Sequence, residues 1–180
     1  MPKMNTYSKR QFDPLKMTTE DVNIIDIAHA LSLLCRGGGH LKQFYSVGQH
    51  CINCANEAKA RNYSNRIILA ALLHDASEAY ISDIIRPVKV HLINYIEIES
   101  NIMNVIFKKF HLDDLSDEEI KQWKEIDDVM LQFELKYLMP DNEKLLLPQV
   151  YSIPDLEVHE CKKIEENYLT FANKLIETIK

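Results

Sequence analysis

The sequence predicts an all-α protein, a single bundle of about six helices that occupies residues 1–180. The first observation is that apolar residues recur three and four positions apart through most of the chain, which places them on one face of a helix. The second is a pair of helix-start signals, Ser46 with Gln49 and Ser116 with Glu119, which both have the form of a capping box. The third is that no segment shows the strong alternation of apolar and polar residues that is typical of a half-buried strand.

The composition is that of an ordinary globular protein, with 46% hydrophobic and 27% charged residues. A chain of 180 residues can bury a substantial core, so we expect one domain. The net charge of −6 argues against a broad surface for a nucleic acid polymer, because phosphate contacts need a basic face. No apolar run approaches the ~20 residues that cross a bilayer, and the N-terminus has no charged-then-apolar leader. We therefore expect a cytoplasmic protein without a membrane partner.

The cysteines fit the same compartment as reduced thiols. Cys51 and Cys54 form a Cys-x-x-Cys pair, a spacing that also occurs in zinc and redox sites. The chain has no second pair of this kind, and on a helix the two side chains share one face, as small core residues do. We favour the core interpretation for both.

The elements follow one another in a simple order. The first 18 residues are polar and we expect them to be irregular. A helix over residues 20–35 ends at Gly37–Gly39, because consecutive glycines stop a helix and permit unusual dihedral angles. A proline-bracketed loop over residues 141–154 precedes a last helix that Asp155 caps. The remaining helices, with a break at Arg86-Pro87, are expected over residues 46–61, 64–80, 88–110, 116–140 and 155–179.

A histidine and an aspartate stand side by side at the end of the apolar run over residues 70–80. Buried ionisable groups cost several kcal/mol unless they are paired or bind a metal, so His74 and Asp75 are candidate metal ligands. Glu78 follows His74 by one helical turn, and its carboxylate can line the same pocket.

Two further candidates lie on other predicted helices. His50 falls in the first turn of the helix that Ser46 opens, and Asp127 falls in the helix that Ser116 opens. Helical domains commonly build metal sites from inward-facing side chains of several helices. The order along the chain is then a histidine, a His-Asp doublet and a later aspartate.

This order resembles the HD-domain phosphohydrolase superfamily, and within it the small bacterial and phage nucleotidases. The resemblance covers roughly residues 25–139 and implies one divalent ion held by His50, His74, Asp75 and Asp127. Two positions depart from that pattern: Gln49 stands where a glutamate is frequent, and Gly37 stands where the 5′-deoxynucleotidases carry tryptophan. The blocks that carry the resemblance are FYSVGQH at 44–50, LLHDASE at 72–78, DIIRPVK at 83–89 and IDD at 126–128.

Imidazoles and ionised carboxylates suit Co²⁺, Mn²⁺, Fe²⁺ or Zn²⁺, with Mg²⁺ as a further option. Such an ion would bind a phosphoryl oxygen and lower the pKa of a bound water towards neutrality. We expect Glu78 to orient that water and move its proton. Asp83 is expected to act as a supporting carboxylate or a proton donor to the leaving group, as the resemblance also implies.

Basic residues near these blocks are candidate phosphate contacts, namely Arg36, His40, Arg86 and Lys89. Together with the resemblance they predict hydrolysis of a nucleotide, a 2′-deoxyribonucleotide or a nucleoside analogue as its mono-, di- or triphosphate. The apolar last helix is a candidate interface for a homodimer.

Two alternatives remain open from the sequence. A two-metal HD phosphodiesterase or oxygenase would use further histidines between the doublet and Asp127, where His91 and His111 lie. A helical regulator would keep the metal for stability and have no activity. Elsewhere, His29 is interpreted as a structural histidine and Asp128 as a solvent-facing residue.

Overall fold

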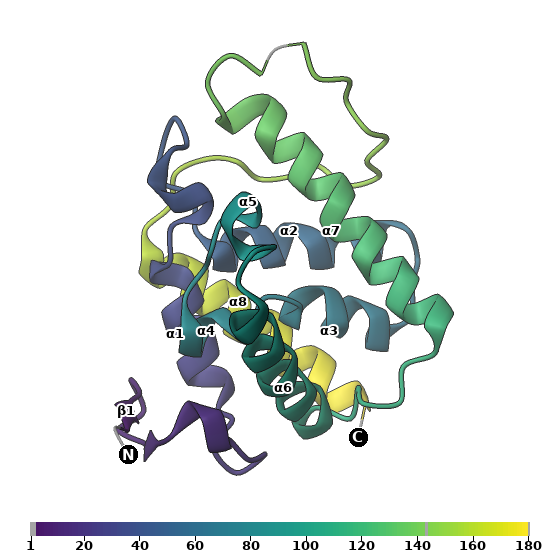
Figure 1. Ribbon diagram of the computed structural model, residues 1–180. Helices are drawn as coiled ribbons and strands as arrows, with labels where there is room; N and C mark the ends of the chain where they lie inside the picture. The colour runs from purple at the N-terminus through teal and green to yellow at the C-terminus, as the bar shows by residue number, and fades with distance from the viewer. Residues whose placement is uncertain (1–2, 143, 180) are drawn as a thin grey trace.

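The computed structural model describes residues 3–142 and 144–179, and most of these residues are helical (Figure 1). The all-α prediction is confirmed at the level of fold class. No helix in these two ranges combines the length and the apolarity that crossing a membrane requires. The helices are α1 (Ile24–Leu33), α2 (Val47–Ala60), α3 (Asn65–Leu73), α4 (Glu78–Ile81), α5 (Arg86–Lys89), α6 (Ile93–Lys109), α7 (Asp117–Leu138) and α8 (Cys161–Ile179), with 3-10 turns η1 (Pro14–Lys16) and η2 (Arg36–Gly39).

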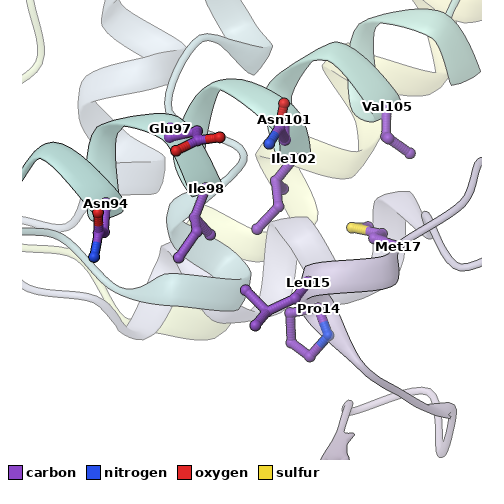
Figure 2. A pocket seen from close by; sticks show the side chains of 9 residues that line it. All are labelled: Pro14, Leu15, Met17, Asn94, Glu97, Ile98, Asn101, Ile102 and Val105. Carbon is purple, nitrogen blue, oxygen red and sulfur yellow. The ribbon is translucent and has the colours of Figure 1, made fainter.

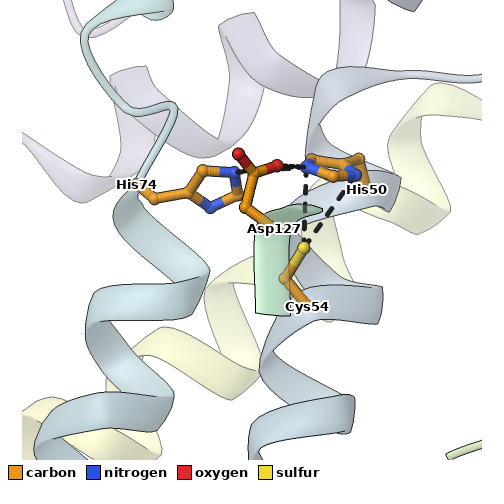
Figure 3. A group of neighbouring side chains, drawn as sticks. All are labelled: His50, Cys54, His74 and Asp127. Carbon is orange, nitrogen blue, oxygen red and sulfur yellow. Dashed lines mark hydrogen bonds and ion pairs between the residues drawn. The ribbon is translucent and has the colours of Figure 1, made fainter. Parts of the chain in front are cut away.

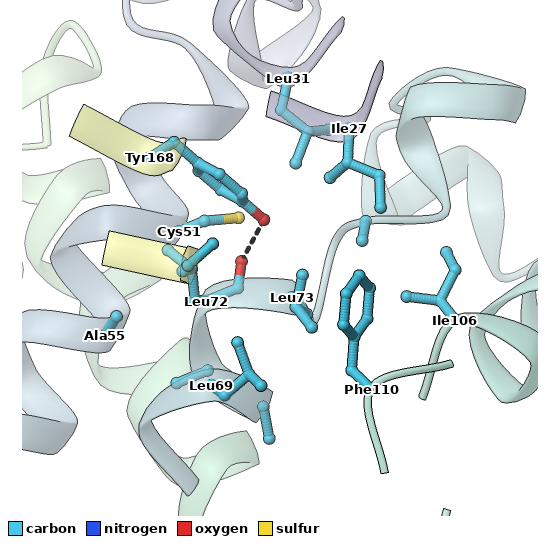
Figure 4. Close-up of a cluster of buried hydrophobic side chains, with 14 of the residues drawn as sticks. Ile27, Leu31, Cys51, Ala55, Leu69, Leu72, Leu73, Ile106, Phe110 and Tyr168 are labelled. Carbon is cyan, nitrogen blue, oxygen red and sulfur yellow. Dashed lines mark hydrogen bonds between the residues drawn. The ribbon is translucent and has the colours of Figure 1, made fainter. Parts of the chain in front are cut away.

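The central element is α3, because every residue from Ile67 to Leu73 is buried. A helix that is apolar on all sides must be covered on all sides, and α2, α7 and α8 pack around α3. Its side chains join those of α1 and α6 in one core (Figure 4). In that core the Tyr168 hydroxyl donates a hydrogen bond of 2.7 Å to the Leu72 carbonyl, which satisfies a polar group beside the end of α3.

The apolar side of α8 is part of this core. Its buried residues, among them Tyr168 and Leu175, pack inside the chain, and α8 contacts α1, α2 and α3. The face that we considered for a homodimer is therefore occupied within the chain.

The helix expected over residues 64–80 is interrupted at residues 74–77, because α3 ends at Leu73 and α4 begins only at Glu78. Between them the backbone bonds close tighter turns, from Ala76 N to the Leu73 carbonyl and from Glu78 N to the Asp75 carbonyl. His74 Nδ1 also donates to the carbonyl of Ala71 at 2.8 Å, the group that a continuous helix would offer to residue 75.

Three other boundaries differ from the prediction. The N-terminal segment, expected to be irregular, contains a hairpin of β1 (Met4–Asn5) and β2 (Gln11–Phe12), whose strands are too short to leave a sequence pattern. A short helix, α5, replaces the break expected at Arg86-Pro87, with the proline in its first turn, where it lacks no needed donor. The last helix begins at Cys161, and Asp155 does not cap it.

The two predicted capping boxes have different outcomes. At Ser116 both hydrogen bonds with Glu119 are present, so this box is confirmed. At Ser46 the side chain accepts from the Gln49 N–H at 3.1 Å, which confirms the start of α2. The Gln49 side chain does not return to Ser46. It donates to the carbonyls of Asp155 and Glu157 at 3.0 and 2.9 Å.

Gln49 is one of three buried polar residues, with Asn53 and Glu57, that follow one side of α2 four positions apart. They hold an extended segment, residues 151–157, which we call the strap. Asn53 Nδ2 donates to the Asp155 carbonyl at 2.8 Å and its Oδ1 accepts from the Asp155 N–H at 3.0 Å. The last part of the expected loop, residues 151–154, is therefore irregular in conformation but belongs to a segment that α2 holds in place.

Glu57 completes this row. Its carboxylate accepts hydrogen bonds from the N–H groups of Tyr151 and Ser152 and from the Ser152 hydroxyl, at 3.0, 2.8 and 2.7 Å. It also pairs with Arg61 Nε at 2.9 Å. A single buried carboxylate thus satisfies most of the polar groups at the start of the strap.

We expect the change Glu57→Ala to lower the free energy of unfolding by about 3 kcal/mol, because it leaves the donors of the strap and Arg61 without their acceptor. Urea unfolding measures this value. The matched control is Glu125→Ala, since Glu125 also pairs with Arg61 but its side chain is 55% exposed. The control is expected to change stability by about 0.5 kcal/mol or less, and equal losses for the two variants would contradict the assignment.

The same residue predicts a pH dependence. Burial raises the pKa of Glu57, but hydrogen bonds from Ser152 and Arg61 outweigh burial and lower that pKa below its ordinary value of 4.5. The carboxylate therefore adds stability above that value and loses it as the pH falls through the lowered pKa. We expect the stability difference between the wild type and Glu57→Gln to shrink from about pH 5 downward, as measured by urea unfolding at several pH values. A difference that stays constant with pH would contradict this.

Candidate metal centre

Four candidate ligands from three parts of the fold meet between α2, α3 and α7. His50 lies in the first turn of α2, His74 and Asp75 directly follow α3, and Asp127 lies in the middle of α7. His50 Nε2 is 3.1 Å from His74 Nε2, 3.2 Å from Asp127 Oδ1 and 3.8 Å from Asp75 Oδ2. His74 Nε2 is 3.4 Å from Asp127 Oδ1 and 3.3 Å from Asp75 Oδ2. Figure 3 shows the carboxylate of Asp127 directed at both imidazoles.

These separations suit ligands of one ion. Ligand atoms that lie ~2.1 Å from a metal, at tetrahedral or octahedral angles, are themselves about 3.0–3.5 Å apart. Both histidines are buried, while the side chains of Asp75 and Asp127 are 20% and 23% exposed, so the site opens to solvent on its carboxylate side.

The other ring nitrogen of each histidine already has an acceptor. His50 Nδ1 contacts Glu134 Oε1 at 2.7 Å, and His74 Nδ1 contacts the Ala71 carbonyl at 2.8 Å. These acceptors place a proton on each Nδ1, so that each Nε2 of a neutral imidazole presents a lone pair to the centre. Two lone pairs and two carboxylate oxygens at these distances repel one another unless positive charge lies among them. The donor set therefore fits a divalent cation.

The charges at the site agree with this interpretation. Burial raises the pKa of Asp75, but His74 and Arg36 outweigh burial and hold that pKa below its usual range. The pKa of Asp127 is lowered in the same way, against burial, by hydrogen bonds with His50 and His74. Both carboxylates are thus ionised at neutral pH. Burial lowers the pKa of His74, but Asp75, Cys51 and Asp127 together outweigh burial and raise that pKa, so without a cation this imidazole binds a proton that a metal must displace.

Arg36 reaches the site because the chain reverses after α1. Gly37, Gly38 and Gly39 have φ angles of 63°, 61° and 80°, a left-handed conformation that glycine adopts without strain. The turn brings Arg36 N within 2.9 Å of the Tyr45 carbonyl, just before α2. The Arg36 side chain then donates from Nη1 to Asp75 Oδ2 at 3.0 Å. The side chain of this expected phosphate contact is 14% exposed and lies beside a ligand, and two of its donors are already used, Nη1 by Asp75 and Nε by Glu134.

Glu78 and Asp83 both follow the doublet, Glu78 at the start of α4 and Asp83 just after the end of α4. Glu78 is buried, and its Oε2 has no hydrogen-bond partner among the described residues. Burial, followed by the charges of Asp75 and Asp83, raises the pKa of Glu78 to about 10. Burial also raises the pKa of the half-buried Asp83. Glu78 therefore carries a proton at neutral pH, which suits an acid that can give up its proton when positive charge arrives.

The other expected phosphate contacts divide into two kinds. Arg86, whose side chain is 63% exposed, lies at the rim of the site, with Nη2 3.8 Å from Asp127 Oδ2 and Nη1 3.5 Å from Asp128 Oδ1. Lys89 instead pairs with Glu99 on α6 at 2.5 Å. His40 is exposed, and within the described ranges no hydrogen bond or ion pair joins its side chain to the four candidate ligands.

The remaining histidines lie apart from the four candidate ligands. His91 and His111 are exposed, and neither belongs to a group of potential metal ligands within residues 3–142 and 144–179. His29 stacks on Tyr7 and pairs with Glu165 at 3.0 Å, as expected of a structural residue. The solvent-facing position of Asp128 is confirmed, since its side chain is 60% exposed.

The structure adds neighbours that the sequence interpretation missed. Cys54 Sγ lies 3.5 Å from His50 Nε2, and one ligand atom from each of His50, Cys54, His74 and Asp127 lies within 4.8 Å of the others (Figure 3). Cys51 lies close to His74 and Asp75 in the same way. Both thiols are buried as predicted, and burial raises the pKa of each, so they lie beside the centre as neutral groups.

Glu134 was also missed as a site residue. It is buried on α7 and contacts His50, Tyr45 and Arg36. Although burial raises its pKa, the charges of His50 and Arg36 lower it, so this carboxylate is ionised. The signal in the sequence was its spacing of seven residues from Asp127, which places both on one face of a helix.

Two hollows lie away from this centre. The first, of ≈ 370 Å³, lies between α6 and η1, where Ile98 and Leu15 line it (Figure 2). The second, of ≈ 530 Å³, is lined by the end of α6 and the end of α8. None of the four candidate ligands lines either hollow.

Comparison with known proteins gives relatives without an assigned activity. No model of a protein family matches the chain. The chain is 39% identical over 109 residues to the uncharacterised protein YfdR of Escherichia coli K12, which is 61% of this chain and 58% of that protein. It is 36% identical over 111 residues to the uncharacterised protein RCAP_rcc00048 of Rhodobacter capsulatus, which is 58% of this chain and 56% of that protein. Each match therefore covers little more than half the length of the relative.

Proposed function

We propose that the protein is a metal-dependent phosphohydrolase of the HD-domain type, which removes phosphate or an oligophosphate from a nucleotide. The substrate is a small molecule, a 2′-deoxyribonucleotide or a nucleoside analogue as its mono-, di- or triphosphate, and the protein acts in the cytoplasm. The observation that carries this proposal is the convergence of two imidazole nitrogens and two ionised carboxylates, in the order His50, His74-Asp75 and Asp127. A buried site of this composition, open on its carboxylate side, suits one Co²⁺, Mn²⁺, Fe²⁺, Zn²⁺ or Mg²⁺ ion.

When bound, such an ion supplies a Lewis acid for the phosphoryl group and an acidified water as nucleophile. The residues of the chain then hold and move protons around it. Arg36 holds Asp75 in place through the Nη1 contact of 3.0 Å. Positive charge nearby lowers the raised pKa of Glu78, so that its carboxyl would lose its proton to solvent, accept a proton from the attacking water and pass that proton to the leaving group. Asp83 is the second carboxylate available to the leaving group.

Arg86 is the best placed cation for a substrate phosphate. Its contacts with Asp127 and Asp128 are long and exposed, so they contribute little and can be exchanged at small cost. A guanidinium can also bind two phosphate oxygens at once. His40 and Lys89 are weaker candidates, since no hydrogen bond or ion pair joins the His40 side chain to the candidate ligands among the described residues and Lys89 is held by Glu99.

The two alternatives fit the structure less well. A two-metal site would need His91 and His111, which are exposed and outside the described ligand groups. A metal-stabilised regulator would have no use for Glu78, whose buried Oε2 lacks a partner among the described residues. A one-metal hydrolase accounts for the exposed positions of His91 and His111 and has a use for the Glu78 carboxyl, whose Oε2 is unpartnered within the described ranges.

We expect one cobalt ion to bind per chain, with a rise in thermal stability that grows with the concentration of the ion. Metal analysis and thermal unfolding with Co²⁺ measure the two effects. His74→Ala and Asp127→Ala are expected to lose both, whereas the controls His91→Ala and His111→Ala are expected to keep both. Two ions per chain, with one lost in the His91 and His111 variants, would contradict the one-metal proposal.

The activity is tested with a panel of nucleoside and deoxynucleoside mono-, di- and triphosphates and each of the five metals. Products are identified so that free phosphate is distinguished from an oligophosphate. We expect Glu78→Gln to bind Co²⁺ as the wild type does but to lower kcat by roughly 10²-fold or more, because it cannot exchange a proton. The control Glu125→Gln changes an exposed carboxylate away from the site and should retain activity. Full activity in Glu78→Gln would remove its proposed role.

A further inference from the structure

One buried carboxylate outside the four candidate ligands, that of Glu134, contacts His50 and the arginine that binds Asp75. Glu134 lies two turns after Asp127 on α7 and is 3% exposed. Its Oε1 accepts hydrogen bonds from His50 Nδ1 and from the Tyr45 hydroxyl, both at 2.7 Å. Its Oε2 lies 3.4 Å from Arg36 Nε. Both oxygens are thus used, and neither is directed to solvent.

These contacts reach two ligands that come from other parts of the fold. The hydrogen bond of Glu134 with His50 Nδ1 fixes the tautomer and the ring plane of His50, so that Nε2 is directed at the centre. The contact of Glu134 with Arg36 reaches Asp75, because Arg36 Nη1 donates to Asp75 Oδ2 at 3.0 Å. Glu134 shares α7 with Asp127. One carboxylate therefore relates the positions of His50, Asp75 and Asp127.

The position of Glu134 is itself fixed. The Tyr45 hydroxyl, which donates to Glu134, accepts a hydrogen bond of 2.9 Å from Asn53 Nδ2. Asn53 in turn binds the backbone of the strap at Asp155. A chain of buried hydrogen bonds thus runs from the strap to His50, and it leaves the carboxylate little rotational freedom.

We propose that Glu134 is a positioning residue of the metal centre, which sets its affinity for the ion by orienting His50 directly and Asp75 through Arg36. The inference rests on the metal site of the proposed function, but it does not depend on the reaction or the substrate. Groups that hold the far nitrogen of a histidine ligand change metal affinity by roughly 10- to 100-fold when they are altered.

A purely structural role makes a different prediction. A glutamate that only neutralises the buried Arg36 would, when changed, destabilise the ion-free and the metal-bound protein equally. The dissociation constant for the metal would then stay the same. The measurement that separates the two roles is therefore metal affinity, with stability recorded beside it.

The experiment compares Kd for Co²⁺, by titration against a chelator that competes for the ion, in the full-length wild type and in Glu134→Gln. We expect Kd to rise by roughly 10- to 100-fold in this variant. The matched control is Glu57→Gln, which changes another buried glutamate that pairs with an arginine but contacts none of the ligands. Its Kd is expected to stay within about threefold of the wild type, although its stability falls.

A wild-type Kd in Glu134→Gln overturns the proposal, whatever its stability. Should this variant fail to fold, Tyr45→Phe removes one of the two hydrogen bonds to Oε1 and keeps the carboxylate. Its Kd is expected to rise roughly two- to tenfold, and an unchanged value there overturns the proposal equally.

If the wild type binds Co²⁺ but hydrolyses no nucleotide, only the proposed function is overturned. If the wild type binds no Co²⁺, both are.

Discussion

The constraint on which the rest of the structure depends is the approach of two imidazole Nε2 atoms to 3.1 Å inside the protein. Each ring has its Nδ1 proton directed at a fixed acceptor, so as neutral imidazoles the two Nε2 atoms cannot satisfy each other. Two carboxylates close the same space. Such an arrangement needs positive charge at its centre, and the fold supplies the rigid supports that keep it together: α3, buried from Ile67 to Leu73, before His74, and α2 and α7 packed against α3.

The helix α2 belongs both to this centre and to the network that holds the strap, because its two sides carry different residues. One side carries His50, Cys51 and Cys54 and faces the centre and the core. The other carries Asn53 and its neighbours in the row that binds the strap. Asn53 belongs to both systems through its bond with Tyr45, since Tyr45 contacts Glu134. The strap is therefore part of the support of the site, although none of its residues is among the candidate ligands.

The sequence predicted what depends on local spacing and missed what depends on contacts between distant residues. Helical periodicity and the Ser116 capping box identified α7 and its start. The end of α3 itself was missed, because apolar periodicity continues through residues 74–77 while the side chain of His74 takes the Ala71 carbonyl. Glu134 in an amphipathic helix looks like a surface residue, and only its partners from α2 and η2 show why it is buried. The late start of α8 was missed because residues 151–157 bind α2.

The balance of charge around the centre bears on the phosphate substrate of the proposed function. Asp75, Asp127 and Glu134 are ionised, and the buried guanidinium of Arg36 compensates one of the three negative charges. Glu78 adds none, since it is protonated at neutral pH. A divalent cation neutralises the remaining two charges and leaves no surplus for the further negative charge that a phosphate brings. That charge must be met by cations at the open side, where Arg86 lies beside Asp127 with 63% of its side chain exposed. In the proposed function, the interior thus holds the ion and the rim binds the phosphate.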